Sequence, residues 1–210
     1  KILMSNLIDS LKMEEWLKTP KIIEAFEKID RKDFMPPGME EMAEINEAFS
    51  IGEGQTISQP LVVAFMLEKL DPGPGQNILD IGSGSGWTTA LLSYLVGEKG
   101  KVTALEVLPE LKEFGEKNVG KYSFLKKGIA EFFCQNGSRG FKERAPFDRI
   151  LVSASVQGEI PKPWKEQLKE GGRIVTPVAN SIRVFKKEDN NFKKEEYSGF
   201  AFVPLVRKNE

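Results

Sequence analysis

The sequence predicts a doubly wound α/β fold with a mostly parallel sheet of seven strands and a helical extension at the N-terminus. From residue 77 onward, short apolar runs alternate with helical patterns, which is typical of parallel strands joined by helices. The first of these runs ends in a glycine-rich segment at residues 80–86. The length of 210 residues, with 40% hydrophobic and 29% charged residues, suits one soluble domain over residues 1–210.

Residues 1–57 form the expected extension, which we assign to the substrate side. A helical pattern covers residues 5–18. Thr19-Pro20 is typical of a second helix start, because threonine caps helices and proline fits their first turn. Apolar residues then follow at helical spacing: Ile22, Ile23, Phe26 and Ile29. Residues 33–57 show little periodicity, so we expect a long ordered arm there.

Residues 58–210 form the expected cofactor-binding core, which begins with a helix near Ser58. Strands are expected at residues 77–81, 101–107, 129–135, 147–153, 173–178, 181–187 and 197–206. Helices are expected at residues 87–96, from about residue 109, and at 161–170, with Gly171-Gly172 ending the last one. A polar turn at residues 189–191 separates the last two strands, which would add an antiparallel edge whose order stays open.

The composition excludes several classes of protein. The chain has no histidine, which removes imidazole bases and histidine-based triads. Its single cysteine, Cys134, cannot form an intramolecular disulfide, so we expect a cytoplasmic protein and a small core thiol rather than a nucleophile. A net charge of −1 and the lack of a long apolar run predict no nucleic-acid partner and no membrane partner. We expect a monomer.

The glycine-rich segment at residues 80–86 has the spacing Asp-x-Gly-x-Gly-x-Gly. Glycines allow a sharp turn and let a ligand approach the main chain. The dinucleotide spacing Gly-x-Gly-x-x-Gly fails, because Trp87 and Thr89 occupy the last position counted from Gly82 and from Gly84. A phosphate-binding P-loop fails as well, because no Gly-Lys-Ser/Thr follows. The segment alone therefore predicts a nucleotide-like ligand.

Glu106 ends the next strand, 20 residues after Gly86, where a carboxylate can accept hydrogen bonds from both ribose hydroxyls. Loop and carboxylate together resemble the Rossmann-like class I methyltransferases; the simpler alternative is a tight turn with a surface glutamate. The resemblance implies S-adenosylmethionine as cofactor and S-adenosylhomocysteine as product. It implies cofactor contacts from Asp80, Gly82, Gly84, Gly86, Glu106 and Val107. Asn136 and Gly137 would lie beside the adenine, or form an ordinary turn.

The absence of certain motifs excludes several classes of methyl acceptor. Enzymes that methylate the amino group of adenine typically have an Asp/Asn-Pro-Pro-aromatic motif after the fourth strand. Here residues 153–156 read Ser-Ala-Ser-Val. Enzymes that methylate C5 of cytosine typically use a cysteine nucleophile preceded by proline, but Cys134 follows Phe133. The sequence has no convincing metal-ligand cluster, so we expect no metal and no catechol-type chemistry.

Residues 51–60, Ile-Gly-Glu-Gly-Gln-Thr-Ile-Ser-Gln-Pro, resemble the signature of the protein-L-isoaspartate O-methyltransferase family. Further matches run through most of the chain: Asp30-Arg31, Phe34-Met35-Pro36, residues 79–86, Glu159-Ile160-Pro161, Gln167-Leu168, Gly171-Gly172-Arg173, Pro177-Val178 and residues 202–205. The family esterifies the α-carboxyl of L-isoaspartyl residues in damaged proteins, and the ester then collapses to a succinimide. The resemblance thus implies a protein-L-isoaspartate(D-aspartate) O-methyltransferase that repairs isoaspartyl proteins and peptides.

The implied reaction suits a chain without histidine, because a carboxyl group of pKa about 3 to 4 is already anionic at neutral pH. The resemblance makes Ser58 the catalytic residue, which would orient the substrate carboxylate. Thr56 would line the same substrate wall. Gln55, Thr56, Ile57 and Ser58 would also lie near the cofactor. The alternative for Ser58 is a helix N-cap ahead of Pro60, and both roles can hold together.

The sequence departs from the family pattern at several positions. Glu44 stands where the family has tyrosine, Asn136 where it has aspartate, and Ala179 where it often has glycine. Residues 153–158 also differ from the usual segment. These departures keep two alternatives open: a divergent carboxyl methyltransferase acting on aspartate of a dedicated peptide, and a non-catalytic S-adenosylmethionine-binding relative.

Overall fold

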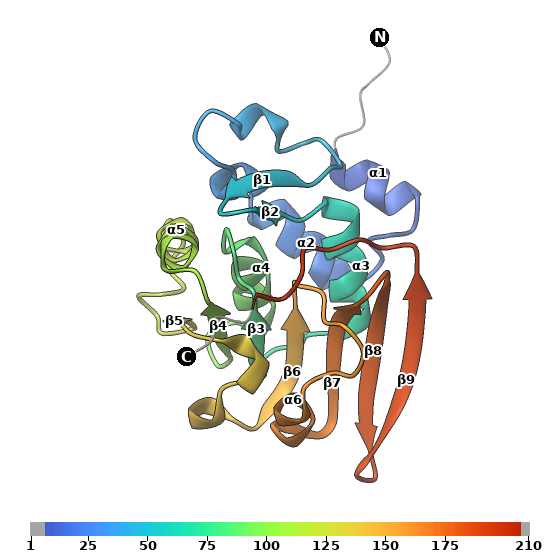
Figure 1. Ribbon diagram of the computed structural model, residues 1–210. Helices are drawn as coiled ribbons and strands as arrows, with labels where there is room; N and C mark the ends of the chain where they lie inside the picture. The colour runs from blue at the N-terminus through green and yellow to red at the C-terminus, as the bar shows by residue number, and fades with distance from the viewer. Residues whose placement is uncertain (1–6, 207–210) are drawn as a thin grey trace.

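The structure is a computed structural model that describes residues 7–206 (Figure 1). Its main sheet has seven strands in the order β5-β4-β3-β6-β7-β8-β9. The strands are β3 (Asn77–Ile81), β4 (Lys101–Glu106), β5 (Ala130–Cys134), β6 (Phe147–Val152), β7 (Leu168–Val178), β8 (Ser181–Glu188) and β9 (Asn191–Ser198). The first five pair in parallel, and β8 and β9 pair antiparallel. The predicted fold class is confirmed.

The two faces of the sheet carry separate apolar layers, because successive side chains of a strand point to opposite faces. Ile78 and Val102 belong to one buried cluster, whereas Leu79 and Ile81 belong to the other. Five helices contribute to the first cluster: α1 (Leu7–Met13), α2 (Pro20–Lys28), α3 (Pro60–Leu70), α4 (Trp87–Val96) and α5 (Pro109–Val119). The short α6 (Lys162–Glu166) supplies Trp164 to the second.

The chain reverses direction across the sheet at β3, which lies between β4 and β6. The carboxyl ends of β3, β4 and β6 meet there, and ligands of doubly wound sheets bind at such a point. The register of β3 against β4 is unbroken, from Asn77 opposite Lys101 to Ile81 opposite Leu105. This regular pairing gives the end of β3 a fixed position.

The N-terminal extension is more ordered than the sequence indicates. It contains α1 (Leu7–Met13), α2, two 3-10 turns η1 (Arg31–Phe34) and η2 (Glu40–Met42), and a hairpin of β1 (Phe49–Gly52) and β2 (Gln55–Ile57). The predicted helix over 5–18 is too long, because α1 ends at Met13 and Glu15 has a φ of 61°. The hairpin was not predicted. Figure 1 shows it above the carboxyl ends of the parallel strands.

Two predicted elements near the C-terminus are wrong. The helix expected over 161–170 stops at Glu166, and Gly171-Gly172 lie inside β7 rather than at a helix end. Gly171 has a φ of 74° at the point where β6 and β7 lose register. The turn predicted at residues 189–191 is confirmed. Strand β9 therefore begins at Asn191, and it ends at Ser198, opposite Ser181, the first residue of its partner strand β8, rather than at 206.

Residues 199–206 therefore form no strand and cross the end of the sheet instead. Val203 and Leu205 bond to the main chain of Ser155, from Ser155 N to Val203 O at 2.8 Å and from Leu205 N to Ser155 O at 2.8 Å. Among residues 7–206, none of the helices has the length and apolar character needed to span a bilayer.

Candidate active site

A cavity of about 730 Å³, counting the open space at its mouth, lies at the carboxyl ends of β3 and β4. Four segments form most of its wall: residues 55–58, 81–85, 105–108 and 203–206. The first comes from the N-terminal hairpin and the last from the C-terminal crossing segment. The cavity therefore brings together parts of the chain that are far apart in sequence.

The glycine loop between β3 and α4 forms the floor of the cavity. Gly82, Gly84 and Gly86 have φ values of 76°, 48° and 85°, in the left-handed region that favours glycine. Gly82 and Gly84 line the cavity, but Gly86 does not. A Cβ on Gly86 would lie 2.6 Å from the carbonyl oxygen of Gly115 in α5. Gly86 therefore permits close packing of the loop against α5.

Glu106, at the end of β4, is 6% exposed and braces the loop. Its Oε2 accepts a hydrogen bond from Gly84 N at 3.0 Å. Its Oε1 accepts from Val107 N at 2.8 Å and from Leu108 N at 3.2 Å. Oε2 can still accept one more hydrogen bond, because a carboxylate oxygen has two lone pairs. Glu106 lines the cavity, so this acceptor is available to a ligand hydroxyl.

Asp80 is fully buried behind the loop and does not line the cavity. Its Oδ2 accepts hydrogen bonds from the hydroxyls of Thr88 at 2.9 Å and Thr89 at 2.6 Å, at the start of α4. Burial raises the pKa of Asp80 to about 6, and the two hydroxyls oppose this rise. Asp80 thus shapes the cavity by holding the beginning of α4.

Two buried polar atoms of cavity-lining residues have no partner among residues 7–206: the Ser83 hydroxyl and the indole Nε1 of Trp87. Unpaired buried groups of this kind are costly and are commonly satisfied by water or a ligand. The spare acceptor of Glu106 and these unpaired groups fit a ligand with both hydroxyl and acceptor groups, as S-adenosylmethionine has. Trp87 also packs edge-on against Phe26, so it lies in both the core and the cavity wall.

Residues 55–58 form the opposite wall. Ser58 and Gln55 are half-buried, Thr56 is exposed, and Ile57 is buried. None of the hydrogen bonds among residues 7–206 involves the Ser58 hydroxyl. The capping alternative for Ser58 is therefore wrong.

The cap of α3 comes from Asn46 instead. Gln59 occupies the N-cap position, but its side chain makes no capping hydrogen bond. The Oδ1 of Asn46 accepts from Leu61 N at 3.0 Å, and the Gln59 side chain donates to the carbonyl of Asn46 at 2.9 Å. Because Asn46 and Gln59 bond to each other's segments, the start of α3 needs no bond from the preceding residue, Ser58, whose hydroxyl lies beside the cavity.

The end of β5 contributes less than the sequence suggests. Asn136 does not line the cavity, and its Oδ1 accepts from Ser138 N at 3.0 Å to cap η3 (Gly137–Arg139). Gly137 and Gln135 do line it. A Cβ on Gly137 would lie 2.3 Å from Ile81 Cγ2, so only glycine fits there. Cys134 was expected in the core but is exposed, because it ends the edge strand β5.

Several cavity-lining residues carry no local sequence signal. Gln135, Ser153 and Ala154 line the cavity, as do residues 203–206, which the sequence indicates as strand. Their position after strand ends, where ligands bind in this class of sheet, is the one clue that could have found the first three. Glu44, a departure from the family pattern, lies outside the cavity and accepts from Leu7 N at 3.2 Å.

Known proteins resemble this chain over nearly its whole length. A profile of the family "Protein-L-isoaspartate(D-aspartate) O-methyltransferase" matches residues 3–210. A protein-L-isoaspartate O-methyltransferase from Pyrococcus horikoshii is 39% identical over 205 residues, which cover 95% of this chain and 90% of that relative.

Two solved structures are similar over most of this chain. A protein-L-isoaspartate O-methyltransferase superposes with a TM-score of 0.84 at 29% identity and covers 96% of this chain, which spans 65% of that protein. A Plasmodium falciparum protein of the same description, solved with S-adenosyl-L-homocysteine, gives a TM-score of 0.87 at 23% identity and covers 97% and 100%. The second likeness is evidence for the fold.

Proposed function

The chain belongs to the protein-L-isoaspartate(D-aspartate) O-methyltransferase family, and we propose that the cavity between residues 55–58 and the glycine loop is its catalytic site. The protein is an S-adenosylmethionine-dependent methyltransferase that esterifies isoaspartyl carboxyl groups of damaged proteins and peptides. The observation that supports the proposed site is the cavity itself. It joins the signature segment at residues 55–58 to the loop and the carboxylate expected to hold the cofactor.

The cofactor side consists of the glycine loop and the end of β4. Gly82 and Gly84 open the floor, and Glu106 accepts a ribose hydroxyl through the free lone pair of Oε2. Val107 and Gly137 border the same space. Three residues support the site without lining the cavity. Asp80 holds the start of α4, Gly86 permits the contact with α5, and Asn136 caps the turn after β5.

The acceptor side consists of Ser58 and Thr56, with Gln55 and Ile57 shaping the wall between them and the loop. The Ser58 hydroxyl, unbonded within residues 7–206, donates to one carboxylate oxygen of the substrate and so orients the other. Thr56 is exposed at the mouth, where the peptide on either side of the isoaspartyl residue passes.

The chemistry requires orientation rather than a base. When bound, S-adenosylmethionine supplies a methyl group on a positively charged sulfur. The carboxylate is anionic at neutral pH, so the protein moves no proton and holds the two reactants in line. Glu106 and the glycine loop would hold the cofactor, and Ser58 would orient the carboxylate oxygen that takes up the methyl group while the sulfur keeps the electron pair of its former bond. The partly enclosed cavity limits competing water.

The acceptor is tested with two peptides that differ only in an isoaspartyl or a normal aspartyl linkage, each given with methyl-labelled S-adenosylmethionine. We expect label on the isoaspartyl peptide and a base-labile ester. Equal labelling of both peptides would contradict the proposal, and preference for the aspartyl peptide would support action on a dedicated peptide. Cofactor binding without labelling of either peptide would indicate the non-catalytic alternative.

A further inference from the structure

Arg31, the first residue of η1, is a buried arginine that belongs to the Asp30-Arg31 match to the family pattern but has no role assigned from the sequence. It is 5% exposed. Its guanidinium donates four hydrogen bonds to main-chain carbonyls: Nη1 to Ala43 O at 3.0 Å and Ile45 O at 2.9 Å, and Nη2 to Glu47 O at 2.8 Å and Ser58 O at 3.1 Å. One side chain therefore donates hydrogen bonds to carbonyls on both sides of the β1–β2 hairpin.

The segment at residues 43–47 has little regular structure, so its carbonyls need partners from outside. Arg31 provides these partners and bonds the carbonyl of Ser58 with the same group. A guanidinium is planar and holds its donors in a fixed fork. The position of Ser58 is therefore tied to the segment that enters the hairpin.

The guanidinium also lies over two aromatic rings. Its central carbon is 5.6 Å from the ring centre of Phe49 in β1 and 5.3 Å from that of Trp87 in α4. Trp87 lines the cavity, and Phe49 pairs with Ile57, the neighbour of Ser58. Arg31 thus connects the acceptor wall to the first residue of the helix that follows the cofactor loop.

The arrangement depends on directed hydrogen bonds rather than on an ion pair. Within residues 7–206, Arg31 forms no salt bridge. Burial lowers the pKa of the guanidinium to about 10, and nearby Glu44 raises it, so the group keeps its charge at neutral pH. A lysine would keep the charge but could not reach four carbonyls with one compact ammonium group.

We propose that Arg31 is a positioning residue for methyl transfer, which holds the main chain of Ser58 in register with the cofactor loop. The inference rests on the proposed function of Ser58 and extends it to a residue outside the signature segment. Arg31 itself does not line the cavity and does not touch the substrate.

The test compares Arg31→Lys, Ser58→Ala and the double variant. For each, the single-turnover rate on an isoaspartyl peptide and the affinity for S-adenosylhomocysteine are measured. We expect Arg31→Lys to lower the rate about tenfold, because small displacements of an orienting group are costly, and to change the affinity by less than about threefold. The double variant should be no slower than Ser58→Ala, because Arg31 acts through Ser58.

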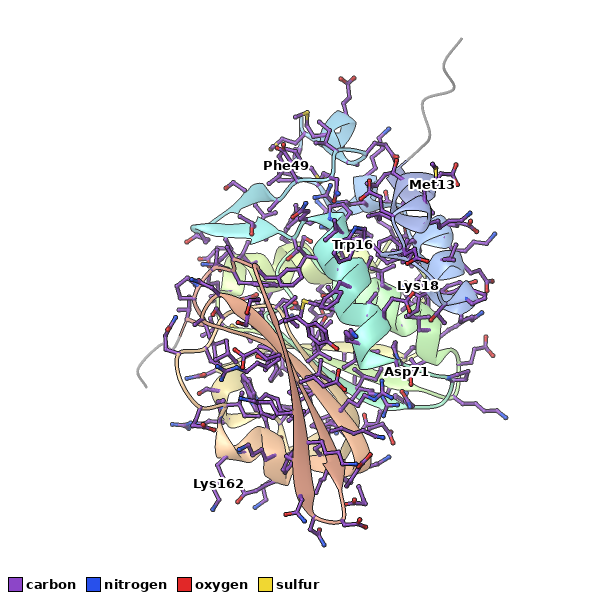
Figure 2. The ribbon with its side chains drawn as sticks, turned by 90° about the vertical axis from the view of Figure 1, so that its right-hand side faces the viewer. Met13, Trp16, Lys18, Phe49, Asp71 and Lys162 are labelled. Atoms are coloured by element: carbon purple, nitrogen blue, oxygen red, sulfur yellow. The ribbon has the colours of Figure 1, made fainter. Side chains whose placement is uncertain are left out.

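Arg149→Lys is the matched control. Arg149 is half-buried, and its Nε also donates to two main-chain carbonyls, Leu70 O at 2.8 Å and Asp71 O at 3.1 Å, at the far end of α3. Figure 2 shows Phe49 and Asp71 well separated along the molecule. This variant should lower the melting temperature and leave the single-turnover rate unchanged, which separates positioning from general stability.

A single-turnover rate for Arg31→Lys equal to that of the wild type would overturn the inference, as would rate losses in the double variant that simply multiply. If Arg31→Lys does not fold, Phe49→Leu replaces it, because it removes one ring and keeps every donor. A rate unchanged in Phe49→Leu would then overturn the inference. A wild-type enzyme inactive on the isoaspartyl peptide would instead contradict the proposed function, and the role of Arg31 with it.

Discussion

The cofactor region and the acceptor arm are held in place by different means. β3, the glycine loop, α4 and β4 form a continuous unit, with β3 paired in register on both sides. The acceptor arm, residues 29–58, has one short hairpin whose register shifts between Ser50 and Gly52. The arm depends on side chains such as Arg31 and Asn46 that bond to distant main-chain atoms. Rigid backbone pairing thus holds the glycine loop, whereas a few side chains hold the segment that carries Ser58.

This difference has a functional consequence. Changes in the cofactor region should alter stability or cofactor affinity, whereas changes in the arm that displace Ser58 should alter the rate of transfer. The predictions below test that division, beginning with the largest expected effect.

Asp80→Asn should change how stability depends on pH. The pKa of buried Asp80 is raised from 3.8 to about 6, so the folded state prefers the protonated form. The wild type therefore loses stability relative to the variant as the pH rises through this range. The loss should total about 3 kcal/mol between pH 3, below both pKa values, and pH 8, above both. Urea unfolding at both pH values measures it. If wild type and variant differ in unfolding free energy by the same amount at both pH values, the prediction is contradicted.

Ser58→Ala should reduce the turnover of an isoaspartyl peptide about a hundredfold, as does the loss of one orienting donor in other enzymes. The affinity for S-adenosylhomocysteine should stay within about threefold, because the cofactor side is held by other bonds. Steady-state kinetics and calorimetry give the two values. The neighbouring Thr56→Ser keeps a hydroxyl and serves as control. Full turnover in Ser58→Ala would remove Ser58 from the mechanism.

Glu106→Ala should weaken cofactor binding about thirtyfold, because a hydrogen bond to a charged group contributes about 2 kcal/mol. The variant also frees three main-chain donors, which loosens the loop. Calorimetry with S-adenosylhomocysteine measures the change. Glu131→Ala, on the adjacent strand and paired at the surface with Arg144, should bind as the wild type does. Unchanged affinity in Glu106→Ala would refute the ribose contact.

Asn46→Ala should cost about 1 kcal/mol of unfolding free energy, because it removes the cap of α3. Asn46→Asp should retain most of the stability, since aspartate also caps well. Thermal unfolding of the three proteins measures the difference. Equal melting temperatures for wild type and Asn46→Ala would show that the capping hydrogen bond from Asn46 does not stabilise the protein.

The same division decides what the sequence could predict. The bounds of β3 and α4 agree with prediction, because apolar runs and glycine spacing are local signals. The hairpin at Phe49 and the bonds of Arg31 depend on contacts across many residues, and no local pattern records them. The crossing segment misled for the same reason. Its apolar residues are typical of a strand, but they pack over the end of the sheet and line the cavity.

The candidate site was anticipated in part. The cavity brings Ser58, Gly84 and Glu106 together, as their places after strands and beside the helix start suggest. Asn136 and Asp80 have the expected location along the chain but point elsewhere, to a turn and to α4. Sequence spacing places a residue near a site, whereas the hydrogen bonds of its side chain decide whether it faces the ligand.

The last strand, β9, leaves one edge of the sheet open, and its middle reads Lys193-Lys194-Glu195-Glu196, all exposed. An open edge can recruit another strand, and charged residues there discourage it. This matters for a repair enzyme, because damaged proteins are often partly unfolded and expose segments ready to pair. We expect the charged edge to keep the enzyme monomeric and to prevent it from aggregating with its own substrates.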